Sequence, residues 1–121
     1  MARDQEKSMS IARSEHDRNE YRKRVATYVD GSSVSYEDAS FVTGDSPLVV
    51  DIATDLGRVG HAGEVINDGS GNILVEISAD GSVYGGQHTL KWGDVLDLDN
   101  LKVSKIRLTW QQNSSYRIFV A

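Results

Sequence analysis

The residues best suited to acid–base or metal chemistry in this chain are its three histidines, His16, His61 and His88. None of them stands in an H-x-H or H-x₃₋₅-H pair, the spacings at which two imidazoles commonly reach one metal ion. His61 and Glu64 are three residues apart, and a third ligand could come from a distant strand. The dense His/Glu motif that such a site needs is missing. We therefore predict polar or packing histidines, with no metal site and no cofactor.

Two Asp- and Asn-rich stretches, at residues 68–72 (DGSGN) and 97–100 (DLDN), resemble calcium loops faintly. Neither matches the D-x-[DN]-x-[DN]-G spacing with its distal Glu. Asp, Asn and Gly are also the usual turn formers, so we predict turns at both places. The glycines form no dinucleotide or Walker loop, and no G-x-S-x-G elbow is present. Ser, His and Asp all occur, but nothing places them together, so we predict no catalytic residues and a protein that is not an enzyme.

Any site must be positioned by the segment 63–80, which organises the chain. Ile73, Val75 and Ile77 alternate with polar or opposite-facing residues, the period of a half-buried strand. Residues 68–71 (DGSG) precede this strand, and we expect Gly69 and Gly71 to supply positive φ angles there. Asp80-Gly81 follows as a two-residue hairpin signal. The segment predicts strand, turn, strand and turn, as in the middle of an antiparallel meander.

The same alternation recurs along the rest of the chain. The expected strands are 39–43, 48–52, 64–67, 72–79, 82–91 with an interruption at Gly85-Gly86, 95–98, 105–111 after a bulge near Ser104, and 116–120. About eight short strands with frequent turn signals are typical of an antiparallel β-sandwich, a jelly roll or a small barrel. The fold class is therefore mainly β, with no long helix in this part. The predicted core is Val50, Ile52, Val65, Ile73, Val75, Ile77, Leu90, Leu96, Leu98, Ile106, Leu108, Trp110, Ile118 and Val120.

Residues 1–30 differ from the β domain at 31–121, and we treat them as a polar, partly helical or extended N-terminal arm. They contain no Gly and no Pro and are rich in charged residues. Tyr21, Val25 and Tyr28 form one short apolar stripe at i, i+4 and i+7. A helix this polar is marginal alone in water. It is either frayed or ordered by docking on a partner, and we choose these three residues as the partner-binding site.

Charge is divided unevenly between the two parts. Residues 1–30 hold seven Lys/Arg and six Asp/Glu, whereas residues 31–121 hold six and twelve, which leaves −6. An acidic β domain argues against direct nucleic-acid binding, which needs a basic stripe. No apolar run is long enough to cross a membrane, and the charged N-terminus predicts no secretory signal. The absence of Cys excludes disulfides and fits synthesis in a cytoplasm.

Five stretches together resemble small accessory virion proteins of tailed phages. They are Asn67–Ile73, Ile77–Gly81, Leu90–Asp94, Ile106–Leu108 and Tyr116-Arg117, within about residues 40–121. The resemblance implies a jelly-roll or sandwich module that decorates or cements capsids, or that sits in necks, tails or baseplates. It also implies a binding role without catalysis, many copies and a terminal arm that lies on a neighbour. It supplies no site residues for this chain.

The leading hypothesis is therefore a virion structural protein, made in the host cytoplasm, that decorates or cements a capsid. Its expected partners are the major capsid protein or neck and tail subunits, and further copies of itself as a homo-oligomer. A neck, tail or baseplate component is the first alternative. A carbohydrate- or receptor-binding module is the second, although a glycan platform needs two or three exposed coplanar rings and aromatic residues make up only 7% of the chain. A cupin-like enzyme is the third.

Overall fold

The computed structural model describes residues 32–121, which form eight strands and two short helical turns. The predicted boundary between arm and β domain, at residues 30 and 31, lies just outside this range. The elements are β1 (Val34–Phe41), η1 (Thr43–Asp45), β2 (Leu48–Asp51), α2 (Ile52–Leu56), β3 (Gly63–Asn67), β4 (Ile73–Ser78), β5 (His88–Leu90), β6 (Val95–Asp97), β7 (Lys105–Trp110) and β8 (Ser114–Val120).

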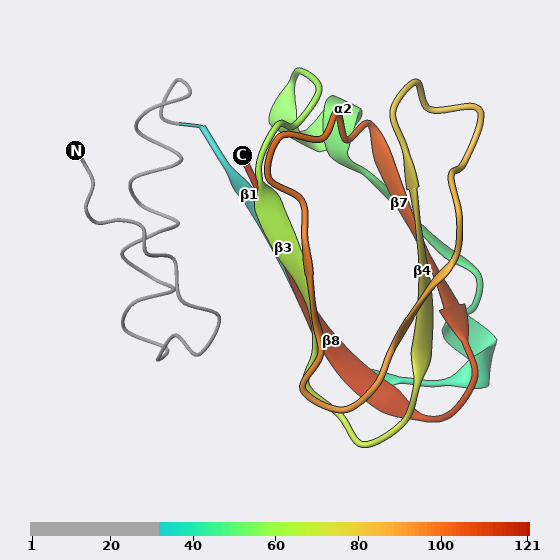
Figure 1. Ribbon diagram of the computed structural model, residues 1–121. Coiled ribbons are helices and arrows are strands. Elements are labelled where there is room, and N and C mark those ends of the chain that lie inside the picture. The colour runs from blue at the N-terminus through green and yellow to red at the C-terminus, as the bar shows by residue number, and fades with distance from the viewer. Residues whose placement is uncertain (1–31) are drawn as a thin grey trace. The chain divides into compact units, whose positions relative to one another are not determined.

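The strands form two four-stranded antiparallel sheets, in the orders β1-β8-β3-β6 and β2-β7-β4-β5. The two layers face each other, with β1, β3 and β8 in one and β4 and β7 in the other (Figure 1). The first strand pairs with the last, the second with the seventh, the third with the sixth and the fourth with the fifth. This nested pairing is that of a long hairpin rolled into two sheets, the jelly roll. The predicted fold class is confirmed.

The core lies between the two sheets. Eleven of the fourteen predicted core residues are buried, and Ile77, Leu96 and Trp110 are half-buried and pack against that core. The predicted core omitted Phe41 and Tyr116, although Tyr116 alternates in phase with Ile118 and Val120; their rings meet edge to face with centroids 5.8 Å apart. It also omitted Val103, which lies out of phase with β7 and bridges to Gly60 as a fully buried side chain.

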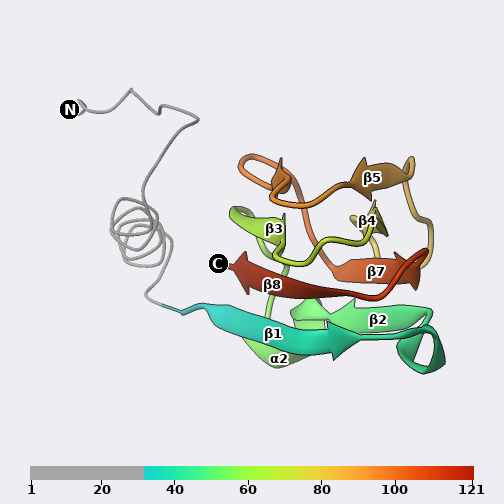
Figure 2. The same ribbon diagram turned by 90° about the horizontal axis from the view of Figure 1, so that it is seen from below.

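The meander predicted at residues 63–80 is wrong, because β3 and β4 belong to different sheets (Figure 2). The chain crosses between layers through residues 68–72. Gly69 and Gly71 do not have positive φ. A Cβ on Gly69 would lie 2.4 Å from Ser114 Oγ, and a Cβ on Gly71 would lie 2.3 Å from the Asn113 carbonyl oxygen. These glycines therefore serve close backbone approach to the β7–β8 loop rather than a hairpin turn.

Other predicted boundaries also shift. β1 begins at Val34, five residues before the strand expected at 39–43. The strand expected at 48–52 ends at Asp51, and α2 replaces the start of the expected loop. The Asp51 carboxylate accepts a hydrogen bond from Thr54 N, and Gly57 ends the helix at φ 85°. Instead of a strand at 82–84, the structure has one isolated bridge between Ser78 and Tyr84.

Within residues 32–121, no helix has the length and apolar character needed to span a membrane.

Candidate functional site

The outward face of the β1-β8-β3-β6 sheet has an apolar centre. Ile66 and Phe119 point away from the core, yet they are only 4% and 8% exposed. Ile66 lies between its cross-strand neighbours Val95 and Arg117. Alternation predicted burial only for the inward residues of these strands, Val65, Ile118 and Val120. The continuous runs Val65-Ile66 and 118–120 (IFV) are the missed signal, because strands buried on both faces are apolar without a break.

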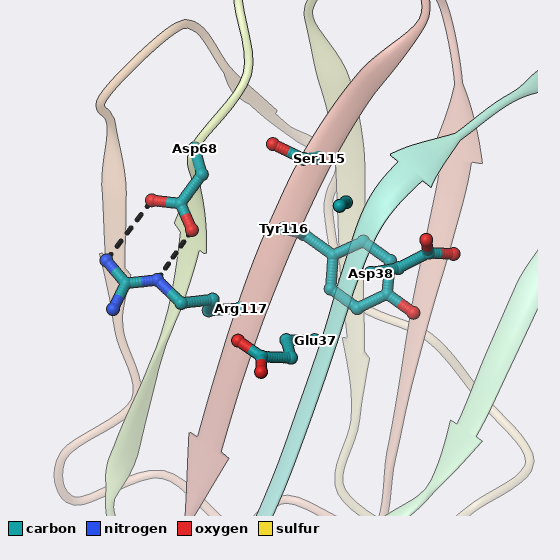
Figure 3. Close-up of a pocket in the computed structure, with 7 residues that line it drawn as sticks. Glu37, Asp38, Asp68, Ser115, Tyr116 and Arg117 are labelled. Carbon is teal, nitrogen blue, oxygen red and sulfur yellow. Dashed lines mark hydrogen bonds and ion pairs between the residues drawn. The ribbon is translucent and has the colours of Figure 1, made fainter.

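Beside this centre, an open pocket of about 400 Å³ lies where β1 and β8 meet. Its lining comes from β1, β8 and the residue that follows β3 (Figure 3). The lining residues are Glu37, Asp38, Ala39, Asp68, Ser115, Tyr116 and Arg117. The ladder between β1 and β8 shifts register after Asp38, so β1 bulges at this place. Bulges commonly redirect side chains at the edge of a sheet, and here the bulge opens the pocket.

Charge in the pocket is mainly negative. The Arg117 guanidinium donates to both carboxylate oxygens of Asp68, with Nη2 at 3.2 Å from Oδ1, and Figure 3 shows the two groups facing each other. Glu37 is the cross-strand neighbour of Arg117 on β1. Asp38 accepts a hydrogen bond from Ser40 N at 2.9 Å. Glu37 and Asp68 lie on the same side of the sheet as Arg117, so two carboxylates accompany one guanidinium there, whereas Asp38 lies on the opposite phase of β1, beside Tyr116.

Tyr116 is the cross-strand neighbour of Asp38, and its ring packs against Phe41 in the core, on the opposite side of β8 from the Arg117 side chain. Its side chain is only 7% exposed, and its hydroxyl has no hydrogen-bond partner within residues 32–121. Burial raises the pKa of the Tyr116 phenol above its ordinary value, and the negative charges of Asp38 and Asp45 add to that rise. The phenol is therefore neutral at physiological pH, and its oxygen can accept a hydrogen bond.

Asn67, which is fully buried, holds this end of the sandwich together. Its amide nitrogen donates to the carbonyls of Gly71 and Leu90, at 2.7 and 2.8 Å. Its amide oxygen accepts from Gly69 N and from Ser114 Oγ, at 3.0 and 2.7 Å. One side chain thereby links the β3–β4 crossover with β5 and β8. Because Asp68 is the next residue, Asn67 also positions the carboxylate that pairs with Arg117.

The outward face of the other sheet is organised differently. Arg107 Nε donates to Glu76 Oε1 at 2.8 Å, and the Arg107 guanidinium carbon lies 4.0 Å from the centre of the Tyr84 ring. The cation is thus shared between a carboxylate and an aromatic face. Elsewhere, Trp92 is 70% exposed in the β5–β6 turn.

The residues selected from the sequence fall elsewhere. Tyr21, Val25 and Tyr28 lie outside the described residues, so their role stays a prediction. His61 and His88 are both exposed. No three His, Asp or Glu side chains of residues 32–121 gather in a way that could hold a metal ion. The DGSGN stretch is a bend in the crossover between the sheets, whereas the DLDN stretch ends in a turn at Asp99-Asn100, where Asp97 accepts a hydrogen bond from Asp99 N.

Comparisons with protein-family models, with curated proteins and with solved structures found no match for this chain.

Proposed function

We propose that this chain is a non-enzymatic structural subunit of a phage particle that decorates or cements the capsid. In this proposal the jelly roll is the rigid body, and the N-terminal segment with Tyr21, Val25 and Tyr28 binds a neighbouring subunit. The chain would act in many copies on the virion, beside the major capsid protein. The same activity in a neck, tail or baseplate is the closest variant of the proposal.

The observation that carries the proposal is the outward face of the β1-β8-β3-β6 sheet. A sheet face that meets only water usually places polar residues at outward positions. Here Ile66 and Phe119 are buried at such positions, and a charged pocket lies beside them. An apolar centre next to charged residues is the usual composition of a protein–protein interface.

The architecture supports the same class of function. Jelly rolls with this nested pairing occur in viral capsid proteins, and also in lectins and cupins. Because a fold alone does not determine function, the choice among these rests on the site. The pocket offers carboxylates and a guanidinium for binding a charged group.

Co-sedimentation with purified phage particles tests the proposal on the full chain. We expect saturable binding with a fixed number of copies per particle, and we expect retention to fall as salt is raised, because the contacts are rich in charge. The triple variant Tyr21→Ala, Val25→Ala, Tyr28→Ala should lose most of this binding. The double variant Val49→Ala, Val83→Ala is the matched control, since it removes exposed apolar side chains from the β domain instead.

Failure to bind any particle in whose proteome the chain is found would refute the proposal. If the triple variant binds particles as well as the parent chain does, the chain could still be a virion protein, but the contact would be made by the β domain. Binding confined to tail or neck fragments would favour the neck, tail or baseplate variant.

A second candidate, glycan binding, is favoured by one observation, the exposed ring of Trp92. Isolated exposed tryptophans can stack on the apolar face of a sugar. Titration with a panel of oligosaccharides, followed by tryptophan fluorescence, should give a saturable change that Trp92→Ala abolishes. No change with any sugar would remove this candidate.

A further inference from the structure

We propose that Trp92, in the turn between β5 and β6, is the anchor of a second assembly contact, and that its indole enters an apolar pocket of a neighbouring virion subunit. The inference rests on the proposed function, because it names the residue and the chemistry of one contact on the particle. It adds a contact made by the β domain itself, which Tyr21, Val25 and Tyr28 do not provide.

The turn that carries Trp92 is fixed by hydrogen bonds within itself and to β3. Asp94 N donates to the Lys91 carbonyl at 2.9 Å, and Lys91 N donates to Asp94 Oδ2 at 2.8 Å. Gly93 has φ 84°, the left-handed conformation that a type II turn needs at this position. Gly93 N donates to the Asn67 carbonyl at 2.8 Å, and Asn67 N donates to the Asp94 carbonyl at 3.0 Å. The backbone at Trp92 is therefore preorganised.

Exposure of the Trp92 side chain is the second observation. Trp92 is 70% exposed, and every other aromatic side chain of residues 32–121 is buried or half-buried. Its indole N–H has no acceptor within the same range, whereas the Trp110 indole donates to Asn113 Oδ1 at 2.9 Å. Tryptophan is enriched among the residues that dominate the binding energy of interfaces. Because the turn is already fixed, burying this ring against a partner costs little further conformational entropy.

The surroundings of the ring identify the kind of partner. A sugar platform needs two or three exposed coplanar rings, and the described part of the chain provides one exposed ring. The pocket that another copy of this chain offers between β1 and β8 does not suit an indole, because its lining includes the charged residues Glu37, Asp68 and Arg117. An indole needs apolar walls and one acceptor for its N–H. We therefore assign the receiving pocket to a different protein, a neighbouring subunit of the particle.

The position of Trp92 in the sandwich gives this contact a separate role. β8 runs from the end where Tyr116 pairs with Asn67 to the end where Val120 pairs with Val34. The turn with Trp92 lies at the first end, since it bonds to Asn67, whereas the N-terminal segment precedes Val34 and so joins the domain at the second end. The two ends are about 14 Å apart, at about 3.4 Å per residue along β8. Contacts at opposite ends suit a subunit that bridges two neighbours.

Co-sedimentation of variants of the full chain with purified phage particles tests the inference. Trp92→Ala should weaken binding roughly thirtyfold, the size expected of a dominant interface residue. Val83→Ala is the matched control, because Val83 is also 70% exposed but lies in the loop between β4 and β5, and it should leave binding unchanged. Both variants should unfold at the urea concentration of the parent, since neither side chain is buried.

A loosened turn tests whether preorganisation contributes. Asp94→Ala removes the acceptor for Lys91 N and leaves the ring in place, so we expect binding about threefold weaker. Asp94→Asn keeps an oxygen for that hydrogen bond and should bind as the parent does. Equal binding by these two variants would contradict the role of the fixed turn.

Combining Trp92→Ala with the triple variant of the N-terminal segment should multiply the two losses, because contacts this far apart act independently. The inference would be overturned by three results, each of which leaves the proposed function intact: parental binding by Trp92→Ala, an equal loss with Val83→Ala, or a combined variant no weaker than the weaker of the two. An oligosaccharide that competes with particles, and whose fluorescence signal Trp92→Ala abolishes, would assign the ring to glycan binding instead. Absence of binding by the parent chain would refute the proposed function itself.

Discussion

The outward faces of the two sheets each carry an arginine paired with a carboxylate, but the groups around the two arginines differ. On the β2-β7-β4-β5 face, Arg107 is held by Glu76 on one side and Tyr84 on the other. On the β1-β8-β3-β6 face, Arg117 pairs with Asp68, and Glu37 is its cross-strand neighbour on β1. On the first face one carboxylate and one ring hold the arginine, whereas on the second two carboxylates lie beside it. The difference fits the proposal that the second face binds a partner.

The largest expected effect concerns the core that both faces share. Leu108 on β7 is fully buried, whereas Val49, on the paired strand β2, is 45% exposed on the outward face. Leu108→Ala should lower the free energy of unfolding by about 2–5 kcal/mol because it leaves a cavity. Val49→Ala should cost less than about 0.5 kcal/mol. Equal losses in urea denaturation would mean that the assignment of inner and outer faces on this sheet is wrong.

Asn67 tests whether the end of the sandwich that carries the Asp68–Arg117 pair depends on one buried amide. Asn67→Ala leaves two carbonyls, one backbone N–H and the Ser114 hydroxyl without their partner. We expect a loss of about 3 kcal/mol in the free energy of unfolding, since each buried group left unpaired is costly. Asn72→Ala, in the same crossover, is the control and should have little effect. Hydrogen exchange should show the loss of protection first at residues 68–71, and uniform loss would contradict the local role of Asn67.

The two ion pairs should differ in strength. The Glu76 side chain is 12% exposed, whereas Asp68 is 34% exposed, and the two arginines are similarly exposed. Screening by water weakens an exposed pair. Glu76→Gln should therefore lower the melting temperature more than Asp68→Asn, and both should lower it less than Asn67→Ala. The reverse order would indicate that the Asp68–Arg117 pair is the stronger of the two.

The sequence predicted the strands far better than their partners. Alternation located most of the strands and eleven buried core positions, because period two follows from strand geometry alone. It could not tell a hairpin from a crossover at residues 68–72, since both use Asp and Gly. The decision depends on contacts with residues that are distant in sequence. Asn67 bonds to Leu90 and Ser114, and Gly69 packs against Ser114 and Ser115.

The candidate site could not be predicted from the sequence either, because it also depends on contacts between residues that are distant in sequence. Asp68 and Arg117 are 49 residues apart, and only the pairing of β3 with β8 brings them together. Alternation at Tyr116, Ile118 and Val120 puts Phe119 on the outer phase of β8, where it gives no signal of burial. The uninterrupted apolar run at residues 118–120 is the signal for a strand segment that is buried on both faces, and alternation alone does not detect it.

The smallest effect on stability at neutral pH is expected for a substitution at Tyr116, whose contribution to stability changes with pH. The folded protein raises the pKa of this phenol through burial and the charges of Asp38 and Asp45. The unfolded chain therefore releases the proton first, near the ordinary value of about 10. Below that pH the contribution of the group to stability is complete, and it is lost as pH rises toward the folded pKa. Tyr116→Phe should unfold at nearly the same urea concentration as the parent at pH 7, and it should lose less stability than the parent between pH 9 and 11. A large loss at pH 7 would mean that the hydroxyl already has a hydrogen-bond partner in the folded protein.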